Sequence, residues 1–142
     1  MTGIWLFQNN ELIKKQIQSG NAFFGTIDTW LLYKFTNGKE YATDHTNASR
    51  TLFFNLHTLQ WDHDLIDRFG LTGIQLPQIK SSSSLYGLTT LDGLLKEPVG
   101  ITALIGDSHA AAFGESCYEA GTAKATLGTG CSLLMNIGNK PL

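Results

Sequence analysis

Asp107 is the acidic residue of this sequence that is best placed to act as a general base. It lies in the segment Ile105–His109 (IGDSH), directly after the short apolar run Ile101–Ile105. Gly100 and Gly106 bound that run, which is the pattern of a buried β-strand. In open α/β sheets, ligands bind beyond the carboxyl ends of the strands. A carboxylate held there can accept a proton from a substrate hydroxyl.

A structural role for Asp107 competes with this chemical one. The residues that follow, Ser108–Glu115, have the composition of a helix. An aspartate at the start of a helix accepts hydrogen bonds from free backbone N–H groups, and position alone favours this capping role. The two roles can coexist only if one carboxylate oxygen stays free, so the residues by themselves leave both open.

A second candidate for chemistry is the triplet Gly128, Thr129 and Gly130. It joins two runs of β-type residues, Ala123–Leu127 and Cys131–Ile137. Glycines on both sides of a hydroxyl residue let a phosphate approach backbone N–H groups, and the threonine adds a side-chain donor. The alternative is a plain turn of a β-hairpin. The triplet lacks the GxGxxG spacing of dinucleotide-binding folds.

The histidines and cysteines show no pattern of metal ligands. The four histidines are scattered and lack HxH or HExxH spacing, so no metal site is expected from the protein's own side chains: they are His45, His57, His63 and His109. Cys117 and Cys131 form no CxxC pair, and we interpret them as reduced thiols of a cytoplasmic protein.

Length and composition exclude several classes of protein. A chain of 142 residues is long enough for one compact domain and too short for two with separate cores. The net charge of −2, with no cluster of Lys and Arg, argues against nucleic-acid binding. No apolar run approaches the roughly 18 residues of a membrane span. The N-terminal residues lack the basic start of a signal peptide.

The hydrophobic pattern predicts an α/β fold. Helices are predicted over Glu11–Ser19, from Asp28 through Phe35, and over Asp62–Phe69, with Asn10 capping the first and Asp62 or Asp64 the last. A short strand is predicted near Lys39–Ala42. The less regular stretch Leu71–Pro98 contains four consecutive serines, Ser81–Ser84, which are predicted to form a loop.

Ordered blocks of the sequence resemble the FGGY family of carbohydrate kinases, and within it the glycerol-kinase branch. The likeness runs from about Gly3 to the C-terminus. Its blocks are Phe24–Leu32, Thr43–Thr51, Phe54–Asp62, Tyr86–Gly87, Gly106–Asp107 and Leu127–Cys131.

The resemblance implies an actin/hexokinase-type ATPase fold of two ribonuclease-H-like domains with a catalytic cleft between them. Residues 1–142 would form a single domain, the later portion of the N-terminal domain, with the C-terminal domain absent. It also implies that Asp107 takes the proton from the substrate hydroxyl that attacks the γ-phosphate of ATP. Thr129, with Gly128 and Gly130, would contact the phosphates of ATP, which is used with Mg²⁺.

The function that the resemblance implies is ATP-dependent phosphorylation of a polyol or sugar hydroxyl, with glycerol converted to glycerol 3-phosphate as the favoured reaction. Asp107 and Ser108 would bind the small-molecule substrate. Ser108 and His109 stand where glycerol kinases usually carry two glutamines. Because Ser108 reaches less far than glutamine, xylulose or another ketose or polyol is the alternative substrate. The full-length enzyme is expected to be a cytoplasmic dimer or tetramer.

Other parts of the family pattern have no match in this sequence. These are the Asp-x-Gly-Thr phosphate loop, the Arg-Glu pair and tyrosine that hold the polyol, and the arginine-containing loop that binds fructose 1,6-bisphosphate. The isolated chain is therefore expected to lack kinase activity and to expose apolar surface that favours self-association. We consider two rivals: a fragment without catalysis, and a GDSL-like hydrolase with Ser108 as nucleophile, although no aspartate follows that serine.

Overall fold

The computed structural model describes residues 2–140, in which helices and short strands alternate. The helices are α1 (Thr2–Asn9), α2 (Glu11–Gln18), α3 (Ile27–Phe35), α4 (His45–Ala48), α5 (His63–Arg68) and α6 (Asp107–Gly114). The strands are β1 (Ala42–Asp44), β2 (Phe54–Asn55), β3 (Gln60–Trp61), β4 (Gln78–Lys80), β5 (Ser83–Thr89), β6 (Val99–Ala103), β7 (Ala123–Leu127) and β8 (Cys131–Met135). None of these helices is long and apolar enough to cross a membrane.

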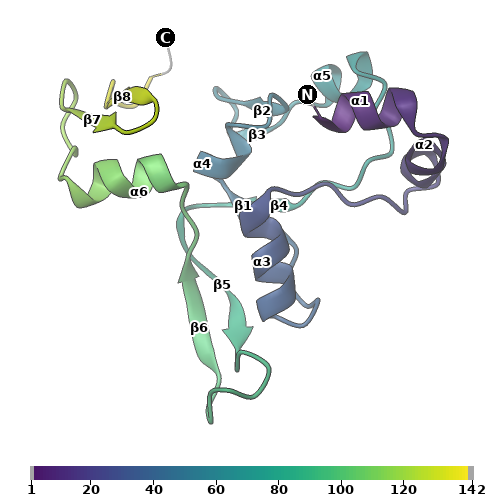
Figure 1. The fold of residues 1–142 in the computed structure, drawn as a ribbon, viewed down its shortest axis with the longest axis horizontal. Coiled ribbons are helices and arrows are strands. Elements are labelled where there is room, and N and C mark those ends of the chain that lie inside the picture. The colour runs from purple at the N-terminus through teal and green to yellow at the C-terminus, as the bar shows by residue number, and fades with distance from the viewer. Residues whose placement is uncertain (1, 141–142) are drawn as a thin grey trace.

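The strands pair into separate two-stranded sheets. β1 and β4 are parallel, while β2–β3, β5–β6 and β7–β8 are antiparallel. The elements spread into three parts that meet near β1 and β4 (Figure 1). Helices α1, α2 and α5 form one part, α6 with the β7–β8 hairpin forms a second, and α3 with the β5–β6 hairpin forms the third.

One apolar core lies under the N-terminal helices. Ile17 of α2 and Ile66 of α5 pack with Phe53 and Leu71, and all four side chains are buried. The helix starts follow the cap signals of the sequence. Asn10 accepts a hydrogen bond from the amide of Ile13 at 3.0 Å, and Asp62 accepts one from Leu65 at 3.1 Å. The predicted helices over Glu11–Ser19 and Asp62–Phe69 are thereby confirmed, with α2 ending one residue early.

A second core joins α3, β1 and β5 beside the segment that leads to the candidate catalytic residue. Leu32 of α3, Ala42 of β1 and Tyr86 of β5 are fully buried together, with Ile101 and Leu104 packed against them. The Tyr86 hydroxyl donates a hydrogen bond to the carbonyl of Ser81 at 2.8 Å, so its polar end is also satisfied. This core fixes the segment that leads from β6 into α6.

The region between Leu71 and Pro98 differs from its sequence-based prediction. It contains β4 and most of the β5–β6 hairpin, and the second half of the serine run begins β5. The strand predicted at Ile101–Ile105 is present but lies two residues earlier, at β6, where it pairs antiparallel with β5. It is largely exposed, so the prediction that it is buried was wrong. The short strand predicted at Lys39–Ala42 lies two to three residues later, at β1.

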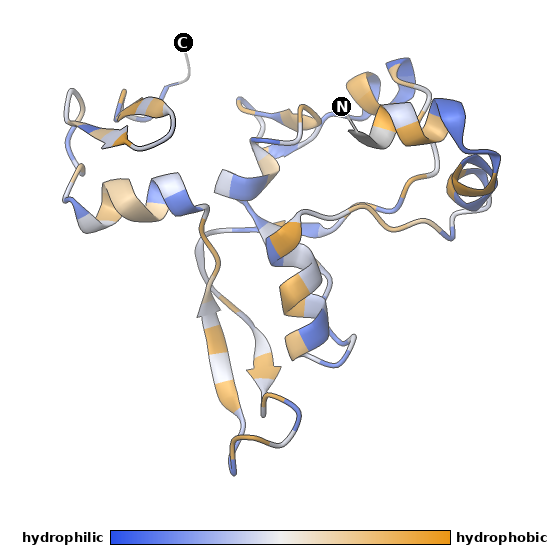
Figure 2. Ribbon diagram, viewed as in Figure 1, coloured by the Kyte–Doolittle hydropathy of each residue, from blue (hydrophilic) through white to orange (hydrophobic). Residues whose placement is uncertain are grey.

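Much apolar surface stays in contact with solvent. The accessible surface is 9765 Å² for a mass of 15.5 kDa. A compact monomer of this mass has about 7,200 Å². Apolar residues alternate along the exposed β5–β6 hairpin and continue on α3 (Figure 2). Exposed large apolar side chains include Trp30, Leu85, Leu88, Leu127 and Leu133. The chain thus carries more apolar surface than its own packing covers.

The first core predicts the cost of truncating one of its side chains. Ile66→Ala should lower the free energy of unfolding by about 2–5 kcal/mol, because the buried side chain has neighbours on several sides and leaves a cavity. Arg68→Ala, at an exposed position of the same helix, should change it by no more than about 0.5 kcal/mol. Urea unfolding followed by circular dichroism measures both, and equal effects would contradict the assignment of this core.

Candidate active site

A pocket of about 590 Å³ surrounds Asp107 at the start of α6. Its walls come from α3, the α4 region, the turn into α6, and β8, which are far apart in the sequence. The lining residues are Ile27, Asp28, Leu31, Thr46, Asn47, Arg50, Ile105, Gly106, Asp107, Ser108, His109, Ser132, Leu133 and Leu134. Helix α6 contacts the β7–β8 hairpin and lies next to α4, in agreement with this set of lining residues (Figure 1).

Asp107 is the first residue of α6 and its side chain is exposed. Gly106 takes the cap position, with extended backbone angles of φ −66° and ψ 143°. The Oδ1 atom of Asp107 accepts a hydrogen bond from the amide of Ser108 at 2.6 Å. Within residues 2–140, the other carboxylate oxygen accepts no hydrogen bond. One oxygen is thus anchored to the helix start, and the second can accept a proton.

The other residues predicted for the site divide into two groups. Ser108 lines the pocket beside Asp107. Gly128, Thr129 and Gly130 do not line it: they form the exposed turn of the β7–β8 hairpin, in which the Gly128 amide donates to the Gly130 carbonyl at 2.9 Å. The predicted hairpin is confirmed. The phosphate contact of Thr129 stays a prediction, since the hairpin reaches the pocket through β8 instead.

Residues 4–114 match the model of the N-terminal domain of the FGGY family of carbohydrate kinases. The match covers more than half of the chain and ends at Gly114, the last residue of α6. The chain belongs to the FGGY family.

Individual FGGY relatives agree with this assignment. Glycerol kinase of Clostridium botulinum (strain Eklund 17B / Type B) is 46% identical over 134 residues, which cover 94% of this chain and 27% of that protein. Glycerol kinase of Pseudomonas fluorescens (strain SBW25) is 48% identical over 136 residues, covering 96% and 26%. The chain therefore spans about a quarter of the length of the relatives that it matches.

Solved FGGY structures show the fold. A Plasmodium falciparum glycerol kinase, solved with ADP, superposes with a TM-score of 0.86 at 41% identity, over 94% of this chain and 27% of that one. A xylulose kinase from Lactobacillus acidophilus superposes with a TM-score of 0.75 at 21% identity, over 92% of this chain and 26% of that one. At this low identity the match supports the fold alone. The chain has part of the actin/hexokinase-type ATPase fold, so the predicted α/β class is confirmed.

The Asp107 pocket and its walls contain residues that sequence reasoning did not single out for chemistry. Asp28 accepts a hydrogen bond from the Thr43 hydroxyl at 2.7 Å. Arg50 is the only lysine or arginine among the described residues that line the pocket, and within residues 2–140 no carboxylate lies within ion-pair distance of it. Asp28 and Arg50 both lie within sequence blocks that resemble the family, and this membership was the available signal.

Asp44 is a buried carboxylate that Thr46 and Asn47, which line the Asp107 pocket, contact through hydrogen bonds. It is 0% exposed and ends β1 as the cap of α4. Burial by itself would raise the pKa of the Asp44 carboxyl, but hydrogen bonds from Ser82, Thr46 and Asn47 outweigh burial and hold the pKa below its usual value. Asp44 is therefore a charged group that the surrounding donors stabilise.

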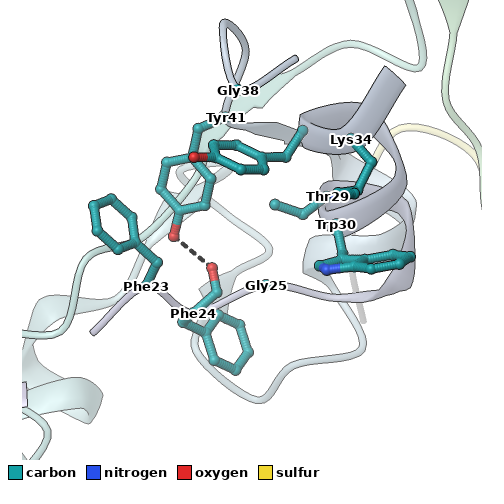
Figure 3. Close-up of a pocket in the computed structure, with 9 residues that line it drawn as sticks. Phe23, Phe24, Gly25, Thr29, Trp30, Lys34, Gly38 and Tyr41 are labelled. Atoms are coloured by element: carbon teal, nitrogen blue, oxygen red, sulfur yellow. Dashed lines mark hydrogen bonds between the residues drawn. The ribbon is translucent and has the colours of Figure 1, made fainter. Parts of the chain in front are cut away.

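A larger pocket, of about 740 Å³, lies on the other side of α3 and has a different character (Figure 3). Its walls are mostly aromatic. The ring of Phe23 packs edge-on against the ring of Tyr41, with 5.3 Å between the ring centres, and the Tyr41 hydroxyl donates a hydrogen bond to the carbonyl of Phe24. Lys34 is its one charged lining residue among those described, and no carboxylate lines it. Without a base, it is a weaker candidate for phosphoryl transfer than the Asp107 pocket.

The Asp44 hydrogen bonds predict a dependence of stability on pH. Because the folded-state pKa is depressed, the stabilisation is present above the unfolded-state pKa of about 3.9 and is lost as pH falls through the folded value. Ser82→Ala removes a bond of 2.6 Å to Asp44 and should raise that pKa. The loss of unfolding free energy between pH 6 and pH 3 should then be smaller than in the unchanged chain.

Urea unfolding at the two pH values tests this expectation. Ser83→Ala is the matched control, because Ser83 is an exposed neighbour that donates no hydrogen bond to Asp44. An unchanged difference between pH 6 and pH 3 in Ser82→Ala would show that Ser82 does not stabilise the charged form.

Proposed function

We propose that this chain is the later portion of the N-terminal domain of an ATP-dependent kinase that phosphorylates a polyol or sugar hydroxyl, with glycerol to glycerol 3-phosphate as the favoured reaction. The observation that carries the proposal is the Asp107 carboxylate, with one oxygen anchored and the other available in a pocket that Arg50 and Ser108 also line. The chain that presents it is 46–48% identical to glycerol kinases over nearly its whole length.

The chemistry assigns a role to each part of the pocket. Asp107 accepts the proton of the attacking hydroxyl as general base, which makes the substrate oxygen a better nucleophile toward the γ-phosphate. Ser108 contacts the substrate beside it. Arg50 places a positive charge on the pocket wall, where it can offset the charge of the transferred phosphoryl group. Outside the pocket, at the exposed turn of the β7–β8 hairpin, Gly128, Thr129 and Gly130 contact the nucleotide phosphates.

Mg²⁺ fits this scheme as an ion held mainly by the nucleotide. Within residues 2–140 no group of three or more His, Cys, Asp or Glu side chains is arranged to bind a metal. Mg²⁺ in kinases keeps several waters and binds phosphate oxygens with only one or two carboxylates, so a protein cage is not required. When bound with ATP, the ion neutralises charge on the phosphates.

The setting of the full-length enzyme follows from the same proposal. Cys117 and Cys131 are free thiols, which is the usual state in the reducing cytoplasm, and we propose a cytoplasmic enzyme. The exposed apolar surface supports assembly into a dimer or tetramer and packing against further protein. The same surface is the observation that favours the second candidate function, a chain that binds partners without catalysis.

The hydrolase alternative has less support. Within the described residues, no hydrogen bond joins the side chains of Ser108 and His109, and the Ser108 amide is bonded to Asp107. A serine nucleophile needs a base within hydrogen-bond reach and a further group that orients the base. The pocket at the start of α6 offers a carboxylate without that arrangement.

The catalytic proposal predicts the effect of one isosteric change. Asp107→Asn in the full-length enzyme should lower kcat by about 10²–10⁴-fold, because asparagine cannot take up the proton, with circular dichroism unchanged. Asp64→Asn, an exposed aspartate on α5, should leave kcat within about twofold. A coupled ADP-release assay over glycerol, xylulose and other polyols measures the turnover and the preferred substrate.

The outcomes of this assay separate the alternatives. Substantial turnover in Asp107→Asn would remove the base assignment, and a preference for xylulose would replace glycerol as the substrate. Absence of turnover with every substrate in the unchanged full-length protein would favour the non-catalytic role.

A further inference from the structure

One hydrogen bond ties the start of α6 to a segment 60 residues earlier in the chain. The amide of Gly106 donates to the hydroxyl of Thr46 at 2.7 Å. The hydroxyl of Thr46 in turn lies 2.6 Å from Oδ2 of Asp44. An ionised carboxylate can only accept hydrogen bonds, so Thr46 must give its single proton to Asp44 and present a lone pair to Gly106. The direction of both bonds is therefore fixed by the charge on Asp44.

Asp44 is a rigid anchor for this chain of bonds. Its two oxygens accept from the amides of Thr46 and Asn47, each at 3.0 Å, and from the Asn47 side chain at 2.7 Å. They also accept from the hydroxyls of Thr46 and Ser82, each at 2.6 Å. These donors come from α4 and from the segment before β5, and Asp44 itself ends β1 and is fully buried. Such charge-assisted bonds are stronger and shorter than neutral ones.

Gly106 is the residue through which this anchor reaches the candidate base. Its amide is held by Thr46, and its carbonyl accepts the hydrogen bond of the Ala110 amide at 2.8 Å, the first of α6. Two residues earlier, in the link from β6, the Leu104 amide donates a hydrogen bond to the Ser82 carbonyl at 3.0 Å. The backbone on both sides of the Gly106–Asp107 peptide is thus fixed, which sets where the Asp107 carboxylate points.

We propose that Thr46 is a positioning residue for Asp107: its hydroxyl, oriented by Asp44, holds the Gly106 amide and so aims the catalytic carboxylate at the substrate hydroxyl. The proposal rests on the kinase function proposed above. Thr46 acts through Gly106, and no hydrogen bond joins it to the Asp107 side chain within residues 2–140. A displacement of the base by about 1 Å costs on the order of 10²-fold in rate, so this single backbone bond has a large effect on turnover.

Two substitutions at Thr46 separate positioning from general stability. Thr46→Val keeps the shape and removes the hydroxyl, while Thr46→Ser keeps the hydroxyl. Thr51→Val is the matched control, because the Thr51 hydroxyl donates to the Ala48 carbonyl at 2.7 Å and has no bond to α6. All three variants are made in the 142-residue chain and in the full-length enzyme.

The first readout is amide hydrogen exchange of Gly106 in the 142-residue chain. Thr46→Val should speed that exchange by about tenfold, the equivalent of one lost hydrogen bond, while Thr46→Ser and Thr51→Val should leave it within about twofold. Unchanged protection of the Gly106 amide in Thr46→Val would overturn the proposed anchor, and this readout needs no kinase activity.

The second readout is the kinetics of the full-length enzyme. Thr46→Val should lower kcat by about 10–10²-fold with KM for substrate and ATP nearly unchanged, and Thr46→Ser should restore kcat to within about threefold. If Thr46→Val does not fold, Thr46→Ser still decides: a loss of more than tenfold in kcat would overturn the proposal, because the hydroxyl is still present.

The two proposals fail in different ways. No turnover by the unchanged enzyme overturns the kinase function, and full turnover by Asp107→Asn removes the base assignment alone. Either result removes the positioning role as well, whatever the exchange of Gly106 shows. An active enzyme that needs Asp107 but keeps its kcat in a folded Thr46→Val overturns the positioning role alone.

Discussion

The buried carboxylate of Asp44 is the group on which the centre of this structure depends. An unpaired charge at a site with no solvent contact would cost several kcal/mol, so the surrounding chain must supply donors. It does so from Thr46 and Asn47, which lie two and three residues after Asp44, and from Ser82, which is 38 residues away. The need to satisfy one charge therefore brings together β1, α4 and the start of β5, and the Asp107 pocket is built on that junction.

The elements that sequence reasoning found are those whose signals are local. Asn10 and Asp62 cap their helices with their own side chains, and the turn at Gly128–Gly130 joins strands that are adjacent in the sequence. Strand β4 was missed because its partner β1 lies about 36 residues earlier, where no local pattern reports the pairing. Strand β6 was predicted to be buried because its residues are largely apolar. Composition alone does not report how much of the rest of the protein covers a strand, and β6 is largely exposed.

The candidate site divides in the same way. Asp107 and Ser108 could be found because strand, glycine and helix signals surround them in one short segment. Asp28, Thr46 and Arg50 come to the pocket only through the packing of α3 and α4 against the start of α6. Their residue types are common on protein surfaces, and only the blocks of family resemblance around them mark them in the sequence. The family match of residues 4–114 supplies the context that short-range patterns lack.

The two apolar cores share no buried residue, and this separation has a consequence for how the molecule tolerates change. The core around Ile17 and Ile66 holds the N-terminal helices, whereas the core around Leu32 and Tyr86 holds the segment that leads to Asp107. Regions with separate cores open as separate cooperative units. Substitutions in the first core should therefore alter how much folded protein a cell retains, while those in the second should alter how well each surviving molecule works. Selection would then act on the first core through the amount of folded protein and on the second core through the activity of each molecule.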